Sequence, residues 1–195
     1  WKRVHKDIFR GPSHHPLCFA ALVGTSSQLA AVVFAAIVLG ALGFLSPANR
    51  GSLMLAFLIF FVLLSYLAGY RAARLYNLYG GTRWQRCAMT TAFAYPGLVF
   101  GLFFVVNLGL WSKGSTAALP FRNMICVLTL WYCVSAPLTF LGCRAGFLHP
   151  RDKLSCPPSV VPSRVPAQGW LWHPLLQSLV CGWVPFCVIF VELYM

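Results

Sequence analysis

The stretch LMLAFLIFFVLLSYLAGY, residues 53–70, contains no charged side chain and includes eleven Leu, Ile, Phe or Val residues. Each of these contributes roughly 0.3–0.6 kcal/mol of favourable free energy to insertion at the centre of a membrane helix. A helix needs about 20 predominantly apolar residues to cross a hydrocarbon core that is ~30 Å thick. The stretch therefore predicts a transmembrane helix.

Four other stretches have a similar length and contain no basic residue, and only the last of them contains an acid, Glu192. They are residues 17–45, 88–111, 124–143 and 175–195. A bilayer admits only helices and closed barrels, because backbone groups in lipid must bond to one another. None of the stretches shows the strict polar–apolar alternation of barrel strands. The sequence predicts an all-α, polytopic membrane bundle with five spans.

The predicted organisation has four parts. Residues 1–16 form a cytosolic segment, and residues 17–147 form four transmembrane helices with short loops. A Pro-rich cytosolic loop follows at residues 148–174, and a truncated fifth transmembrane helix occupies residues 175–195. Since the chain begins at Trp1 and ends within an apolar run, we expect it to be an excerpt of a longer protein.

The composition excludes an ordinary soluble domain, because 59% of the 195 residues are hydrophobic and only 9% are charged. Soluble domains are roughly 45–50% apolar and ~25% charged. The formal net charge of +12 is explained by topology. Of the fifteen basic residues, all but Arg50, Lys113 and Arg122 fall on the side of the membrane on which the N-terminus of the chain is predicted to lie. The positive-inside rule makes that side cytosolic, so the charge requires no nucleic-acid partner.

The inventory of groups that could perform catalysis is short. The carboxylates are Asp7, Asp152 and Glu192, and the first two fall in predicted cytosolic segments. An intramembrane aspartyl-protease pair is therefore excluded for this chain. The sequence also has no HExxH, GxSxG, P-loop or GxGxxG motif. We expect no enzymatic activity, no cofactor and no metal site.

Polar and small residues inside the predicted spans are the candidate functional residues. Gln28 and Asn107 can bond between helices, at ~0.6 to 2 kcal/mol each. Glu192 is a candidate ion or proton site, unless it reaches water near the end of the last helix. Gly97 and Gly101, four residues apart, would let another helix approach closely, within the bundle or from a partner. Gly142 and Gly146 have the same spacing.

Cys87 follows Arg83, Trp84 and Arg86 at the predicted cytosolic start of the third span, which makes it a candidate palmitoylation site. Most of the other cysteines fall within spans or at their ends, where a small apolar thiol packs well. We predict no disulfide among them.

Three prolines predict kinks, because each removes a backbone hydrogen bond inside a span. They are Pro96, Pro137 and Pro185, in the third, fourth and fifth predicted spans. Kinked neighbours can enclose a cavity. A small-molecule or ion transporter or channel is therefore the alternative hypothesis of function.

Several strings resemble the nonaspanins, the transmembrane-nine superfamily of endomembrane proteins. The most specific are LGALGFLSPANRGSL at residues 39–53 and AGYRAARLY at residues 68–76. Also similar are WKRVHKDIFRGP at residues 1–12, LWYCVSAPLTFLGCRAGF at residues 130–147, and VPSRVPAQGW and WVPFCVIFVEL near the C-terminus. The resemblance covers nearly the whole chain and would place it at the second to sixth of nine spans.

The resemblance implies a role in protein transport, in which Golgi and endosomal membrane proteins assist the localisation of other proteins to membranes. The expected partners are the lipid bilayer and client transmembrane proteins, including ones with glycine-rich helices. No catalytic residue comes with the family. Gln28, Asn107, Glu192, Gly97 and Gly101 are the candidates for lateral recognition of a client helix.

Overall fold

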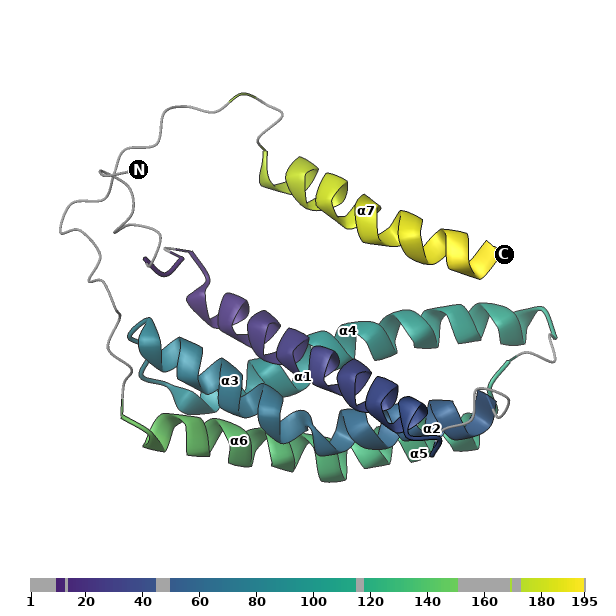
Figure 1. Ribbon diagram of the computed structural model, residues 1–195, viewed down its shortest axis with the longest axis horizontal. Helices are drawn as coiled ribbons and strands as arrows, with labels where there is room; N and C mark the ends of the chain where they lie inside the picture. The colour runs from purple at the N-terminus through teal and green to yellow at the C-terminus, as the bar shows by residue number, and fades with distance from the viewer. Residues whose placement is uncertain are drawn as a thin grey trace. The chain divides into compact units, whose positions relative to one another are not determined.

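The computed structural model describes residues 10–12, 14–44, 50–114, 118–150, 169 and 173–194, and its regular elements there are helices (Figure 1). They are α1 Pro16–Ala41, α2 Arg50–Leu63, α3 Ser65–Leu78, α4 Trp84–Ser112, α5 Phe121–Leu130, the π-helical turn η2 Trp131–Ser135, α6 Ala136–Leu148 and α7 Pro174–Tyr194. The chain divides into two compact units, and α7 belongs to a different unit from the other helices. The bundle of α1 to α6 is therefore described separately from α7.

Three continuous helical rods are long and apolar enough to cross a membrane: α1, α4, and α5–η2–α6 together. The pair α2 and α3 makes a fourth crossing if it is counted as one bent span. The predicted all-α membrane bundle is thus confirmed. Helix α7 has a shorter apolar part, Leu175–Val191, so the fifth span stays a prediction.

The second predicted span is broken instead of straight, and it ends later than the sequence indicated. Helices α2 and α3 meet at a 40° bend, and α3 extends to Leu78 instead of ending at residue 70. No proline lies at the break. Two side chains donate to the Phe61 carbonyl there, Gln28 Nε2 at 2.6 Å and Ser65 Oγ at 3.0 Å. Side chains that bond to helix carbonyls in this way bend helices, which accounts for the break.

The fourth predicted span is one continuous rod of residues 121–148 with a π-helical turn in its middle. This turn, Trp131–Ser135, directly precedes the turn that contains Pro137. Proline has no N–H to donate to the preceding turn, and a wider turn accommodates the missing bond. Pro96 and Pro185 lie inside α4 and α7, as the sequence predicted.

Helix α3 lies between α1 and α6 (Figure 1). The contacts are so close that there is no space for added side chains. A Cβ on Gly142 of α6 would collide with the Tyr66 carbonyl, and a Cβ on Gly69 of α3 would collide with the Thr139 carbonyl. On the other side of α3, a Cβ on Gly24 would lie 2.5 Å from the Ala68 carbonyl oxygen. Such close contact gives the dispersion attraction that holds helices together in lipid.

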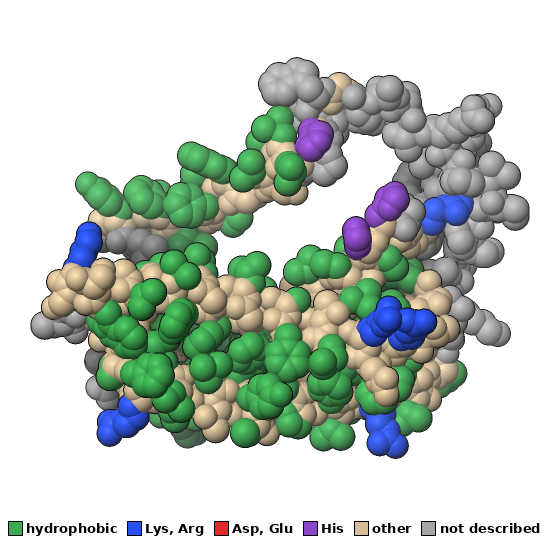
Figure 2. Space-filling model, turned by 180° about the vertical axis from the view of Figure 1, so that it is seen from behind, with side chains coloured by type: hydrophobic (Ala, Val, Ile, Leu, Met, Phe, Trp, Pro, Cys, Tyr) green, Lys and Arg blue, Asp and Glu red, His purple; other side chains and the backbone are tan. Residues whose placement is uncertain are grey.

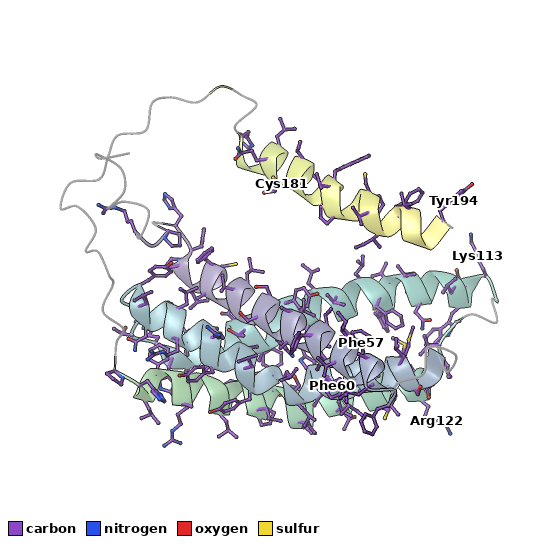
Figure 3. The ribbon with its side chains drawn as sticks, viewed as in Figure 1. Phe57, Phe60, Lys113, Arg122, Cys181 and Tyr194 are labelled. Carbon is purple, nitrogen blue, oxygen red and sulfur yellow. The ribbon has the colours of Figure 1, made fainter. Side chains whose placement is uncertain are left out.

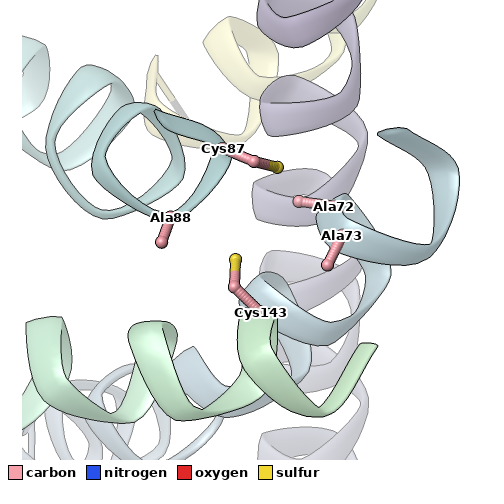
Figure 4. Packing of buried hydrophobic residues seen from close by; sticks show 5 residues of the cluster. All are labelled: Ala72, Ala73, Cys87, Ala88 and Cys143. Atoms are coloured by element: carbon pink, nitrogen blue, oxygen red, sulfur yellow. The ribbon is translucent and has the colours of Figure 1, made fainter. Parts of the chain in front are cut away.

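Small side chains from three helices form a fully buried cluster in the bundle (Figure 4). Its members are Ala72 and Ala73 of α3, Cys87 and Ala88 of α4, and Cys143 of α6. The Cys143 thiol donates a hydrogen bond to the Gly69 carbonyl oxygen at 3.2 Å. The cluster joins α4 to the α3–α6 pair near the short α3–α4 connection.

The side chains on the outside of the bundle are mostly apolar, and the cations lie toward its ends (Figure 2). The described cations at the end shared by the α3–α4 connection and the end of α6 include Arg71, Arg74, Arg83, Arg86 and Arg144. Lys113 and Arg122 lie at the other end, where α4 finishes and α5 starts (Figure 3). Apolar faces of this extent are unsuited to water and are suited to lipid.

Candidate functional site

A cavity of about 530 Å³ lies between α1, α2, α4 and the α5–η2 rod. Buried lining residues form its inner end: Val32 of α1, Val62 of α2 and Ser135 of η2. Exposed lining residues form its rim, including Met54 of α2 and Val99 of α4. The cavity is therefore a cleft that opens at the side of the bundle.

We call this cleft the lateral cavity. Its wall contains no charged side chain. Its polar side chains are those of Tyr95, Trp131 and Ser135. The Trp131 indole N–H donates to the Ala92 carbonyl oxygen at 3.2 Å and so has a partner within the fold. Pro96 also lines the lateral cavity, next to the α4 turn that contains the missing hydrogen bond.

A hydrogen-bonded chain of polar groups lies at the inner end of the lateral cavity. The Ser65 and Ser135 hydroxyl oxygens are 2.6 Å apart, and Gln28 Nε2 lies 3.4 Å from Ser65 Oγ. Both serines are satisfied when Ser135 donates to Ser65 and Ser65 donates to the Phe61 carbonyl. Among the described residues that are not exposed, no buried side-chain nitrogen or oxygen lacks a partner. The inner end of the lateral cavity therefore requires no polar ligand.

The predicted polar residues occupy separate sites. Gln28 is buried and ties α1 to the break between α2 and α3. Asn107 is buried near the end of α4, where its Oδ1 accepts from the Leu119 amide at 2.9 Å. Its Nδ2 donates to the Leu119 carbonyl at 3.3 Å and to Met124 Sδ at 3.2 Å. Neither residue lines the lateral cavity, so the polar pathway that a transporter needs is not formed by these two side chains.

The two glycine candidates, Gly97 and Gly101, lie on α4. Gly101 of α4 has no neighbouring atom within 4 Å of an added Cβ, and for Gly97 the nearest is in the Trp131 ring at 3.8 Å. Gly101 therefore faces open space and Gly97 has the Trp131 ring beside it, whereas Gly142 and Gly146 pack against α3. The Glu192 side chain lies outside the described residues.

Cys87 has an exposed fraction of 0%, within the cluster of α3, α4 and α6. An acyl-transferring enzyme cannot reach a thiol in this position without separating the helices. Burial therefore argues against the palmitoylation hypothesis, which stays an untested prediction. The seven described cysteines are free thiols.

The sequence did not single out three residues that make contacts between helices, which are Ser65, Ser135 and Gly69. A serine in an apolar span is common and gives no signal by itself. The small residues Ala68, Gly69, Ala72 and Ala73 contained the information about Gly69, because two pairs of them are four residues apart and this spacing favours close helix contact. Within the described ranges, no group of three His, Cys, Asp or Glu residues could hold a metal ion.

The long apolar helices, the cations toward the ends of the bundle and the side-opening cavity define a polytopic α-helical membrane protein. The family model of Endomembrane protein 70 matches residues 1–195, and the chain belongs to this family. The resemblance to the transmembrane-nine superfamily is thereby confirmed.

Curated relatives from plants, animals and an amoeba match the whole chain. It is 40% identical to Transmembrane 9 superfamily member 8 of Arabidopsis thaliana over 194 residues, covering 100% of this chain and 30% of the relative. It is 40% identical to Transmembrane 9 superfamily member 2 of Homo sapiens, covering 100% of this chain and 29% of the relative. The Putative phagocytic receptor 1a of Dictyostelium discoideum is 36% identical, with 100% and 30% coverage. The chain thus spans about 30% of the length of these relatives. No solved structure matches it.

Proposed function

We propose that this protein resides in Golgi and endosomal membranes and assists the localisation of other membrane proteins by binding their transmembrane helices from the side. Membership of an endomembrane protein family supports the location. The names of the three relatives, two superfamily members and a putative receptor, are not enzyme names, which supports a binding role.

The open face of α4 around Gly97 and Gly101 is the observation that carries this proposal. Glycines remove side-chain bulk, so a second helix can approach the backbone and gain dispersion contacts. The flanking residues Leu98 and Leu102 are exposed by 69% and 65%, and they provide apolar contacts beside the glycines. Within the described bundle this face is unoccupied near Gly101. A client with a glycine-rich helix has the matching surface.

The division of the cations supports an orientation in which the N-terminus of the chain is cytosolic. Arg71, Arg83 and Arg144 lie toward the end of the bundle where α3 and α6 finish and α4 starts. Lys113 and Arg122 lie at the opposite end. Since basic residues accumulate on the cytosolic side, the α3–α4 connection would face the cytosol.

Co-purification of the full-length protein with a client that has a glycine-rich span tests the proposal. Gly101→Ile adds bulk to the open face, and its Cβ meets no atom of the fold within 4 Å. We expect it to weaken client binding by about 1 kcal/mol, roughly fivefold. Gly109→Ile is the matched control, since Gly109 is on the same helix and also faces open space. Equal binding by both variants and the wild type would contradict the proposal.

A further inference from the structure

We propose that the lateral cavity is a binding site for one acyl chain of a bilayer lipid, which enters from the side of the bundle. The inference does not depend on client recognition. It rests on the depth of the cavity, the chemistry of its wall and the exposed residues at its rim.

The lateral cavity lies at the depth of lipid tails. Its α2 wall runs from Met54 to Val62, and α2 begins at Arg50. At about 1.5 Å of rise per residue, this wall extends from roughly 6 to 18 Å below the start of the helix. Ser135, at the inner end of the cavity, lies about 21 Å from Phe121, where the α5–η2–α6 rod begins. Lipid headgroups stay outside a hydrocarbon core ~30 Å thick, so the part of a lipid that reaches this depth is its tail.

The chemistry of the wall suits a methylene chain better than water or a polar ligand. No charged group lines the cavity, and the Ser65–Ser135 pair at its inner end is already hydrogen-bonded. Water molecules need two to four polar partners to occupy an internal site, and this wall does not offer them. A cavity of about 530 Å³ also lies within the range of sites that hold small apolar ligands.

A bilayer supplies a suitable occupant at the rim of the cavity. Met54 and Val99 line the cavity and are exposed by 76% and 45%, so lipid tails contact them. An unfilled cleft would leave its wall atoms without dispersion partners on one side. A neighbouring tail that moves inward restores those contacts without exposing any polar group.

Photolabelling provides a test that separates a bound tail from lipid that merely surrounds the protein. The full-length protein is reconstituted into nanodiscs of phosphatidylcholine that include a fraction with a diazirine near the end of one acyl chain. After irradiation, adducts are mapped by peptide mass spectrometry. Val32 and Val62 are exposed by only 3% and 8%, so surrounding lipid cannot label them. We expect adducts on both residues.

Two variants of α4 complete the test. Val99→Trp adds bulk at the rim, and it should lower adducts on Val62 roughly tenfold, because a filled rim leaves no space for a chain. Adducts on Leu55, which is exposed and does not line the cavity, should not change, which shows that the bundle remains folded. Val106→Trp is the matched control, since Val106 is an exposed valine of α4 outside the cavity. Val106→Trp should leave the adducts on Val62 and on Leu55 unchanged.

Two results would overturn the proposal. Val32 and Val62 without adducts in the wild-type protein would mean that another helix of the longer chain, or nothing, fills the cavity. Adducts on Val62 that persist in Val99→Trp would mean that the label arrives by another route. Neither result bears on client binding through Gly101, which has its own assay.

Discussion

The Ser65 hydroxyl oxygen lies 2.6 Å from that of Ser135, and this contact joins the two irregular points of the bundle. Ser65 begins α3 directly after the break at Leu64, and Ser135 ends the π-helical turn before Pro137. The backbone departs from regular α-helical geometry at both points, and each point contributes one serine hydroxyl to the contact. The contact therefore fixes the position of the bend in one span relative to the wide turn in the other.

Ser135→Ala should destabilise the bundle. It removes the bond to Ser65 while leaving Ser65 bonded to the Phe61 carbonyl. Interhelical hydrogen bonds in membranes are worth ~0.6 to 2 kcal/mol, and we expect a loss of that size in the free energy of unfolding in bicelles. Ser26→Ala is the control, because the exposed Ser26 hydroxyl bonds within its own helix. Losses of the same size from both substitutions would show that the contact between the spans contributes nothing.

Gly142→Ala should be more damaging than its size suggests. The added methyl group collides with the Tyr66 backbone, which cannot move away as a flexible side chain would. Overpacking of this kind costs about 1–3 kcal/mol, measurable as a lower unfolding free energy. Gly40→Ala meets no atom within 4 Å and should be neutral or slightly stabilising. A neutral Gly142→Ala would be incompatible with the close α3–α6 contact.

Asn107→Ala should loosen the connection between α4 and α5. The Leu119 amide loses its acceptor, the Asn107 Oδ1 atom at 2.9 Å. We expect faster hydrogen exchange at the Leu119 amide, since local opening no longer breaks this bond. Ser112→Ala, at an exposed residue that bonds to the Gly109 carbonyl, should leave that amide unchanged. An unchanged exchange rate in Asn107→Ala would contradict the assigned role.

Cys87 should resist thiol reagents in the folded protein. Its exposed fraction is 0%, whereas Cys18 near the start of α1 is exposed. In variants that keep only one of these cysteines, we expect a membrane-permeant maleimide to modify Cys18 and to spare Cys87 until the protein is unfolded. Modification of Cys87 as fast as Cys18 would show that the helix cluster opens readily, and would revive the palmitoylation hypothesis.

The sequence predicted those parts of the fold that depend on local composition. Charge-free apolar runs located α1, α4 and the α5–α6 rod, and Pro137 indicated an irregularity in that rod. The break at Leu64 was not predictable, because one of the two donors to the Phe61 carbonyl, Gln28, lies on another helix. Within residues 53–70 only Ser65, four residues after Phe61, could indicate a bond from a side chain to the Phe61 carbonyl, and a serine in an apolar span gives no signal by itself.

The candidate site shows the same division between local and distant information. Gln28 and Asn107 were recognised because an amide in an apolar run must find partners. The prolines indicated that kinked spans can enclose a cavity, and Pro96 lines the lateral cavity. The contribution of α1 and α2 to its wall was not recognised, because these segments carry no distinctive residue type there. The burial of Cys87 could not be predicted for a related reason. Its basic neighbours are visible in the sequence, but the burial of its thiol depends on α3 and α6.

The position of α3 has a consequence for the biosynthesis of the protein. The thiol of Cys143 and the carbonyl of Gly69 that it contacts are 74 residues apart in the chain. At a synthesis rate of about 5–20 residues per second, the α6 face would emerge roughly 4–15 seconds after the α3 face that it covers. During that interval the small-residue surface of α3 is exposed to the insertion machinery and to neighbouring nascent helices. Slowed translation between the two segments should therefore increase mispairing, even though every residue of the finished protein is unchanged.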